Sequence, residues 1–325
     1  MNKNFWAEKI NFKNLSVPRL MSAPIDGILD SPTRQLIRLF SPTALLFGQM
    51  RHVASVANAK ITDEFNVQKL EHPFCFQISA NSINFVEQAL EKILEQNFEM
   101  INLNSGCPAR KIIDAGSGAA LMANIPLLKE LIKIIIKKVN GKIPVTIKIR
   151  AGYNEKNGLE VAQICESLGI DGIIIHPRLK NQGFTGELDF DLVKKIKQTV
   201  KIPVIFSGNI IDGQSASQTY DLTGVDGIMI GRALYGAPWK IKQILSELLS
   251  EHFEITEKEK MDLAIKHLKL NSKFYGLKHG FNVIKQHLPY YIKNIPDAAK
   301  IRHSLVLSQN EQEVETILIK LRDSV

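Results

Sequence analysis

The chain has 325 residues, and 41 Lys and Arg against 33 Asp and Glu give it a formal net charge of +8. Hydrophobic residues make up 45% and charged residues 23% of the sequence, which excludes a disordered chain and predicts a basic globular protein. Apolar runs such as 131–136 are far shorter than the roughly 18 residues of a membrane span, and residues 1–15 hold no apolar signal core, so we expect no membrane association and a cytoplasmic location.

Short apolar runs rich in β-branched residues recur along most of the chain, and each ends in polar or glycine residues, as buried strands do. The predicted strands are 20–26, 44–50, 74–79, 100–106, 145–150, 172–178, 204–209 and 227–232. Helical apolar spacing lies between them at 31–39, 84–96, 125–139, 158–168, 188–200 and 213–223. Eight strands alternating with helices over about 230 residues specify an α/β fold of the (β/α)8 TIM-barrel type rather than an open doubly wound sheet.

The strand pattern stops after Trp239, and the remaining sequence has only helical spacing. Helices are predicted at 241–249, 258–274, 280–291 and 312–321. This change of pattern predicts two domains, a TIM-barrel catalytic domain at 1–245 and a small all-α helical-bundle domain at 246–325.

Polar residues end most of the predicted strands, and in (β/α)8 barrels the active site lies at those carboxyl ends. Lys148 stands inside an otherwise apolar strand, where a charge is costly unless it faces a partner or a ligand. The glycine-containing ends of the last two strands are where such barrels commonly bind phosphate, which implies a phosphorylated cofactor. The candidate residues at the strand ends are Asp26, Gln77, Asn104, Lys148, Arg150, His176, Arg178, Ser207, Gly208, Asn209, Gly231 and Arg232.

Two of these candidates have a plain structural alternative. Gln77 would also suit an amide at the edge of the core that bonds to backbone, and a lone histidine such as His176 is most often a satisfied core residue. The place of His176 at a strand end, two residues before Arg178, favours a functional role.

Three cysteines, Cys75, Cys107 and Cys165, are an odd number at wide spacing without a C-x-x-C pair, which predicts neither disulfides nor a bound metal. Cys75 lies in a Phe-Cys-Phe run and Cys165 in a predicted helix, so both are expected to be inert core residues. Cys107 stands between Gly106 and Pro108 in a tight turn after a strand, which suits a nucleophile or a proton donor.

The motifs together resemble the tRNA-dihydrouridine synthases of the bacterial type, flavin-dependent reductases of uridine in RNA. The resemblance rests on six segments in the family's order, which are 102–111 with its Gly-Cys-Pro turn, 145–150, His-Pro-Arg at 176–178, 182–186, 224–239, and the carboxyl-terminal 285–302.

The resemblance implies FMN, with NADPH or NADH as a transient reductant. It implies that Cys107 is the acid that protonates carbon-5 of a flipped-out uracil while hydride reaches carbon-6. The residues implied for the cofactor are Pro24, Ile25, Asp26, Gln77, Lys148, His176, Ser207, Gly208, Asn209, Gly231 and Arg232. The residues implied for the RNA are Asn104, Arg110, Lys111, Arg150, Arg178, Lys278, Lys285 and Arg302. The implied partner is tRNA, with no DNA, and a monomer is the expected state.

The sequence departs from the family pattern at Ile25-Asp26, Pro177, Ser207-Gly208-Asn209 and Tyr290-Tyr291. These departures leave recognition of the base open. The helical stretch 262–302 carries eight Lys and Arg against only Asp262 and Asp297, which favours RNA contact, although a solvated lysine face would look the same.

Two alternatives to a tRNA-dihydrouridine synthase remain at this stage. One is a flavin-dependent TIM-barrel oxidoreductase of a small pyrimidine or enoate, and the other is a tRNA-binding protein without turnover. Structured ribosomal RNA is an alternative target, and the modified uridine, expected in the D-loop, is not fixed by the residues.

Overall fold

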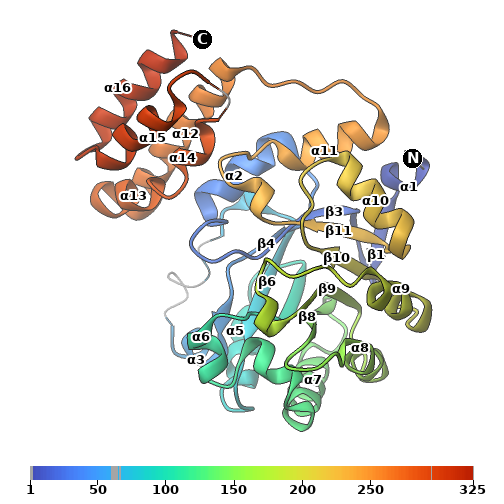
Figure 1. Ribbon diagram of the computed structural model, residues 1–325. Coiled ribbons are helices and arrows are strands. Elements are labelled where there is room, and N and C mark those ends of the chain that lie inside the picture. The colour runs from blue at the N-terminus through green and yellow to red at the C-terminus, as the bar shows by residue number, and fades with distance from the viewer. Residues whose placement is uncertain (1–2, 60–64, 66, 294, 325) are drawn as a thin grey trace.

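The computed structural model describes residues 3–59, 65, 67–293 and 295–324. Its main sheet is a parallel barrel with neighbours in the order β3-β11-β10-β9-β8-β7-β6-β4, and β5 also pairs with β6 (Figure 1). The strands are β3 (Leu20–Ser22), β4 (Leu46–Phe47), β5 (Arg51–His52), β6 (Phe74–Ser79), β7 (Met100–Ser105), β8 (Val145–Gly152), β9 (Gly172–Leu179), β10 (Val204–Ser207) and β11 (Gly227–Ile230).

The barrel closes between β3 and β4, which are too short to form a ladder. The Ser22 backbone N–H donates to the Leu45 carbonyl at 3.2 Å, and the Phe47 N–H donates to Ser22 Oγ at 3.0 Å. These two bonds join the first and second barrel strands. The predicted (β/α)8 fold is therefore confirmed.

Helices surround this barrel on the outside (Figure 1). Several begin at an Asp or Asn whose side chain accepts a backbone N–H of the first turn, as Asp30, Asn124, Asp189 and Asp212 do. The helices of the barrel region are α1 (Lys3–Ala7), α2 (Ser31–Phe40), α3 (Val53–Asn58), α5 (Val86–Leu94), α6 (Arg110–Asp114), α7 (Ile125–Val139), α8 (Gly158–Ser167), α9 (Phe190–Thr199), α10 (Gly213–Thr223) and α11 (Lys240–Leu249), with short 3-10 turns at 69–71, 118–122, 180–182 and 232–234.

An antiparallel hairpin of β1 (Lys9–Phe12) and β2 (Leu15–Pro18) was not predicted from the sequence pattern. Its buried residues Ile10, Phe12 and Val17 share one apolar cluster with barrel residues including Met21 and Ile205. A Cβ at Gly172 would lie 2.6 Å from the Phe12 ring, so the absence of a side chain at the start of β9 makes room for that ring. The hairpin thus fills part of the barrel interior.

The carboxyl-terminal region is a separate bundle at the upper left of Figure 1. It consists of α12 (Glu257–Tyr275), α13 (Leu277–Ile284), α14 (Leu288–Tyr291), α15 (Ala298–Leu307) and α16 (Glu311–Arg322). The single helix predicted at 280–291 is wrong, because the chain divides there into α13 and α14. Pro289, in the first turn of α14, lacks an N–H and would clash with the carbonyl four residues earlier in a continuous helix. Helix α15 was missed, and Leu305 is its one fully buried side chain among the residues described.

The boundary expected at 245/246 falls inside α11. Ile241, Ile244 and Leu248 of this helix pack in the barrel's main apolar cluster, and α12 begins only at Glu257. We therefore propose a domain boundary in the segment 250–256.

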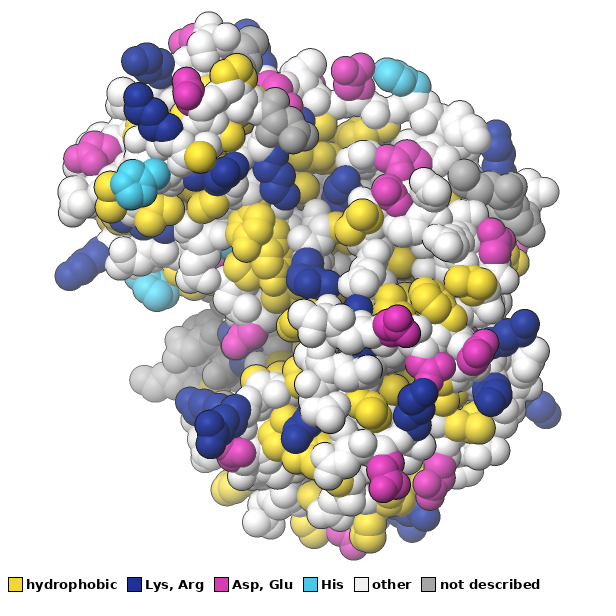
Figure 2. Space-filling view, viewed as in Figure 1, with side chains coloured by type: hydrophobic (Ala, Val, Ile, Leu, Met, Phe, Trp, Pro, Cys, Tyr) yellow, Lys and Arg dark blue, Asp and Glu magenta, His cyan; other side chains and the backbone are white. Residues whose placement is uncertain are grey.

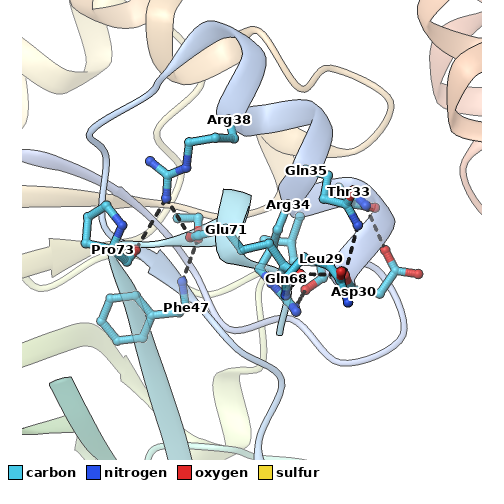
Figure 3. Close-up of polar contacts among 12 residues, drawn as sticks. Leu29, Asp30, Thr33, Arg34, Gln35, Arg38, Phe47, Gln68, Glu71 and Pro73 are labelled. Atoms are coloured by element: carbon cyan, nitrogen blue, oxygen red, sulfur yellow. Dashed lines mark hydrogen bonds and ion pairs between the residues drawn. The ribbon is translucent and has the colours of Figure 1, made fainter. Parts of the chain in front are cut away.

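The bundle docks on the barrel through α2, which is itself fixed by buried charges (Figure 3). Arg34 Nε donates to Glu71 Oε2 at 2.5 Å, and Arg38 Nη2 donates to the Glu71 carbonyl at 2.7 Å. Both arginines and Glu71 are buried. Because breaking a buried pair leaves an uncompensated charge, this network holds α2 firmly to the segment before β6.

The contacts across the domain junction start from the first turn of α2. Asp30 accepts the Thr33 N–H at 3.0 Å and the Tyr275 hydroxyl at 3.0 Å, while Thr33 Oγ1 lies 3.2 Å from His267 Nε2. His267 Nδ1 lies 3.1 Å from the Tyr291 hydroxyl. One carboxylate therefore both caps a barrel helix and anchors the bundle.

Ligand atoms of Asp30, His267 and His287 lie within 4.8 Å of one another, close enough for a metal ion. Both ring nitrogens of His267 and both oxygens of Asp30 already have hydrogen-bond partners in the junction. The hydrogen bonds of these side chains therefore join the two domains. The expectation of no bound metal stays a prediction. In the part of the chain described, no helix is long and apolar enough to cross a membrane.

We expect Gly172→Ala to destabilise the fold by about 1–3 kcal/mol, because the new methyl group would overpack the Phe12 ring. Urea unfolding followed by circular dichroism measures the loss. Adding Phe12→Leu to Gly172→Ala should recover part of it, whereas additive losses in the double variant would mean that the two residues do not compete for one space.

Candidate functional site

Polar side chains from neighbouring strands form a hydrogen-bonded chain that runs from Asn104, near the carboxyl end of β7, into the interior of the barrel. Asn104 Nδ2 donates to Gln77 Oε1 at 2.9 Å, Gln77 Nε2 donates to Asn102 Oδ1 at 2.8 Å, and Asn102 Nδ2 donates to Thr146 Oγ1 at 2.9 Å. All four are buried. Since each amide end has a partner, the chain fixes the orientation of Gln77 and leaves one of its N–H groups for a ligand.

The turn that carries Cys107 is held at both sides. Asn104 Oδ1 accepts the N–H groups of Gly106 at 3.1 Å and Cys107 at 2.9 Å, and the Cys107 carbonyl accepts the Ala119 N–H at 3.0 Å. A Cβ at Gly118 would lie 2.8 Å from the Cys107 carbonyl oxygen, so this glycine lets the 118–122 turn approach. The half-buried thiol is consequently held at the rim of the barrel.

Arg150 is buried beneath this turn. Its Nε donates to the Gly106 carbonyl at 2.8 Å and its Nη1 donates to the Leu179 carbonyl at 2.9 Å, with Gly183 at 3.3 Å. Only 1% of the residue is exposed. The guanidinium therefore ties the Cys107 turn to the loop after β9 and presents no free face to solvent.

Lys148 lies half-buried on β8, and its ammonium group makes no hydrogen bond or ion pair with the residues that the structure describes. Burial, reinforced by the charge of Arg150, lowers the pKa of Lys148 to about 8. An ammonium held in this position without a partner is suited to an anionic or polarisable ligand.

His176 is a neutral histidine in this site. Burial, followed by the charges of Lys148 and Arg150, lowers its pKa to about 2. Arg178 Nη1 lies 3.1 Å from His176 Nε2, and because a guanidinium can only donate, Nε2 accepts and the ring proton is on Nδ1. His176 is thus a fixed donor at Nδ1 rather than a cation.

The ends of β9, β10 and β11 converge on Asn209. Its Oδ1 accepts from Arg232 Nη2 at 3.0 Å and from Arg178 Nη1 at 3.5 Å, and Arg178 also donates to the Gly186 carbonyl. Gly208 has a φ of +156°, and a Cβ there would lie 2.9 Å from Leu188. A glycine is needed at this position, next to two arginines.

Phe184 covers one side of this group. Its ring stacks on His176 with centroids 5.9 Å apart, and the Arg232 guanidinium lies 4.9 Å from its centroid. The sequence pattern placed Phe184 in a motif but gave it no role, because only the fold brings the 182–186 loop over β9 and β11.

The other candidates for the cofactor lie around the same rim. A Cβ at Gly231 would lie 3.3 Å from Ile25 Cδ1, so the ends of β3 and β11 adjoin. Pro24, Ile25 and Ser207 are half-buried there, and Asp26 is exposed. Ile25 and Gly231 are therefore neighbours at this end of the barrel, and the roles of these candidates stay predictions.

The candidates for RNA contact are more scattered. Arg110 and Lys111 are exposed on α6 beside the Cys107 turn, and Lys278 is exposed on the bundle. Lys285 Nζ donates to the Ser308 carbonyl at 2.5 Å, and Arg302 Nη1 donates to the Ile292 carbonyl at 2.9 Å. These last two side chains stabilise the bundle itself, a role that the sequence pattern did not suggest.

Cys75 and Cys165 are fully buried, as predicted. Burial raises the pKa of both thiols, that of Cys165 to about 12. Neither takes part in the rim of the barrel.

The fold and the site define a (β/α)8 barrel whose carboxyl end gathers Lys148, Arg150, Arg178 and Arg232. None of these four forms an ion pair within the described ranges, so this end of the barrel carries an excess of positive charge. Solved structures with the same fold include morphinone reductase, with a TM-score of 0.54 at 12% identity over 76% of this chain and 92% of that one. Another is histamine dehydrogenase from Rhizobium, with a TM-score of 0.59 at 10% identity over 82% of this chain and 51% of that one.

Sequence comparison gives the family. The chain belongs to the dihydrouridine synthase (Dus) family, whose profile matches residues 21–325. It is 28% identical to the probable tRNA-dihydrouridine synthase of Rickettsia bellii over 94% of this chain and 95% of that protein. It is 30% identical to the tRNA-dihydrouridine synthase B of Pseudomonas putida over 87% of this chain and 85% of that protein. The family resemblance seen in the motifs is confirmed.

We expect Asn104→Ala to loosen the Cys107 turn, because two backbone N–H groups lose their acceptor. Cys107 should then react several-fold faster with iodoacetamide, measured by mass spectrometry of the labelled peptide. The other two cysteines are buried and should stay unlabelled. The matched control is Asn81→Ala, which removes an exposed asparagine bound to the Ala115 carbonyl of a neighbouring loop; equal rates in both variants would contradict the role of Asn104.

Proposed function

We propose that this chain is a tRNA-dihydrouridine synthase that reduces the 5,6 double bond of uridine with FMN and a nicotinamide reductant. The observation that carries the proposal is the half-buried Cys107 thiol, whose turn is held by Asn104 and Arg150 beside cations that no carboxylate pairs. Membership of the dihydrouridine synthase family supports it.

The residues at the strand ends fit FMN. Gly208 and Gly231 adjoin Arg232, Arg178 and Asn209 at the ends of the last strands, which suits a phosphate. Lys148 and the remaining N–H of Gln77 would face the ring or ribityl, with Pro24, Ile25, Asp26 and Ser207 at its edge and His176 donating from Nδ1. When bound, the flavin supplies a hydride equivalent that originates from NADPH or NADH.

Cys107 then performs the proton chemistry on the substrate. Its thiol gives a proton to carbon-5 of the uracil as hydride reaches carbon-6, and solvent reprotonates the sulfur. The base must leave the RNA stack to reach the rim, at a cost of a few kcal/mol, which favours a loop uridine such as one in the D-loop. Asn104 is bound to Gln77 and to the turn, so we assign it to positioning Cys107 as well as to facing the substrate.

For the RNA we propose contact by the exposed Arg110, Lys111 and Lys278. Arg178 borders the reacting base, and Arg150 acts by holding the Cys107 turn. Lys285 and Arg302 shape the bundle that carries the other basic residues. We further propose that the protein works as a monomer in the cytoplasm, and that the partner is tRNA rather than DNA.

The test is dihydrouridine formation on unmodified tRNA with FMN and NADPH, read by mass spectrometry as a gain of two hydrogens. The purified wild type should show a flavin spectrum and form product. Cys107→Ala should keep the spectrum and the reduction of its flavin by NADPH but lose product formation about 100-fold or more, since a positioned acid contributes on that order. Full product formation by Cys107→Ala would remove the thiol from the mechanism, and a flavin that reduces no tRNA would move the proposal to a small pyrimidine or another RNA.

Affinity for FMN should fall as the pH rises through about 8, because Lys148, whose pKa is lowered to about 8, then loses its charge. Below that pH Lys148 is protonated, and its charge contributes fully to the affinity for FMN. Quenching of flavin fluorescence on binding, measured from about pH 6 to about pH 9, follows the loss of affinity. Lys148→Met should bind weakly with a flatter pH profile, and an unchanged profile in this variant would assign the titration to another group.

A further inference from the structure

A pocket of about 470 Å³ lies between the barrel and the bundle, outside the rim described above. Its walls come from the turn after β11 and the start of α11, from the connecting segment at Phe253, and from Tyr290 of the bundle. This volume is in the range of pockets that take one small ligand or one nucleotide. Figure 2 shows basic and hydrophobic side chains where the bundle meets the barrel.

Three lysines line the pocket, each from a different part of the chain. Lys240 stands at the start of α11, Lys260 on α12, and Lys293 just after α14. Lys260 is paired with Glu257 at 2.5 Å, whereas the ammonium groups of Lys240 and Lys293 form no hydrogen bond or ion pair with any described residue. Two cations of one pocket are therefore available for an anion.

The three lysines also repel one another in this space. Burial, with the charges of Lys293 and Lys260 among the further causes, lowers the pKa of Lys240. Glu247 and Asp212 act in the opposite direction and raise the pKa of Lys240. Glu254, at the pocket wall, lies 3.7 Å from His252. An anionic ligand between Lys240 and Lys293 would relieve the repulsion.

An aromatic face adjoins these cations. The Tyr290 side chain is 39% exposed, and Lys293 Nζ lies 5.6 Å from its ring centroid. Tyr235 packs against it edge-on with centroids 5.1 Å apart, which fixes the ring while leaving part of it open. A base stacks on such a ring without sequence preference.

Two loops link the wall of the pocket to the site in the sequence. Ile211 of its wall follows Asn209 by two residues, and Ala233 directly follows Arg232. A polymer whose one nucleotide lies at the barrel rim would have its neighbouring nucleotides near these loops. The lysines would bind a phosphate and the Tyr290 ring would stack on a base. A nucleotide therefore fits this pocket better than a phosphate alone.

We propose that this pocket binds a second nucleotide of the RNA substrate, with its phosphate between Lys240 and Lys293 and its base against Tyr290. The inference rests on the proposed function. The RNA would then contact the protein at two places, the reacting uridine at the rim and a second nucleotide at the junction between the domains. The second contact would orient the RNA on the barrel.

The test uses the full-length holoenzyme with Lys240→Gln/Lys293→Gln and, separately, Tyr290→Leu. The double variant should raise the Kd for unmodified tRNA about tenfold and reduce the slope of log Kd against log salt by up to about 2, since each lysine removed leaves about one phosphate charge without its neutralising partner. Tyr290→Leu should raise the Kd about tenfold with the salt slope unchanged, because stacking carries no charge. KM for tRNA should rise in both, while NADPH reduction of the flavin and the single-turnover rate at saturating tRNA stay within twofold.

The matched control is Lys129→Gln/Lys133→Gln, which removes two exposed lysines from α7, at the far side of the barrel from the bundle (Figure 1). An equal loss of affinity in this control, or no loss in either pocket variant, overturns the inference and leaves the proposed function standing. Lower thermal stability in a pocket variant with wild-type affinity for tRNA overturns it as well, since the residues would then only join the domains. A wild-type protein that neither binds nor reduces tRNA overturns both proposals.

Discussion

The central constraint in this molecule is the burial of positive charge at one end of a closed barrel. Lys148, Arg150, Arg178 and His176 come from two adjacent strands, and no carboxylate within the described residues pairs with the three cations. Burying a charge is costly unless hydrogen bonds or a ligand offset the cost. Backbone carbonyls supply that offset for Arg150, whereas Lys148 is left for a ligand.

Hydrogen bonds to buried polar groups also determine the conformation of the turn that carries Cys107. Arg150 needs carbonyl acceptors, and the one that its Nε reaches is that of Gly106, next to Cys107. Asn104 satisfies the N–H groups of the same turn from the other side. The position of the thiol therefore follows from satisfying buried polar groups, which explains why a strand rich in apolar residues ends in Asn, Gly, Cys and Pro.

The sequence pattern predicted the barrel and the strand ends well, because buried parallel strands are continuous apolar runs and their polar ends are visible locally. It could not assign Arg150, Lys285 or Arg302 to backbone carbonyls, since their acceptors lie far from them in the chain or on another helix. The hairpin at 9–18 was missed for a related reason. Its burial depends on the space that Gly172 leaves in a distant strand, and no short pattern records that space.

The junction between the domains extends these constraints to the whole RNA. Asp30 caps α2 and accepts the Tyr275 hydroxyl, and α2 is tied to the segment before β6 by the buried Arg34–Glu71 pair (Figure 3). The bundle is thereby oriented by a helix that belongs to the barrel, and its Tyr290 contacts the loop that follows the strand end proposed for the phosphate. Under the proposed function these contacts set the reach from the bundle to the rim, and we propose that the choice of uridine then depends on the shape of the RNA. On this proposal, we expect that a base held at a different distance from the bundle's contacts would not reach Cys107.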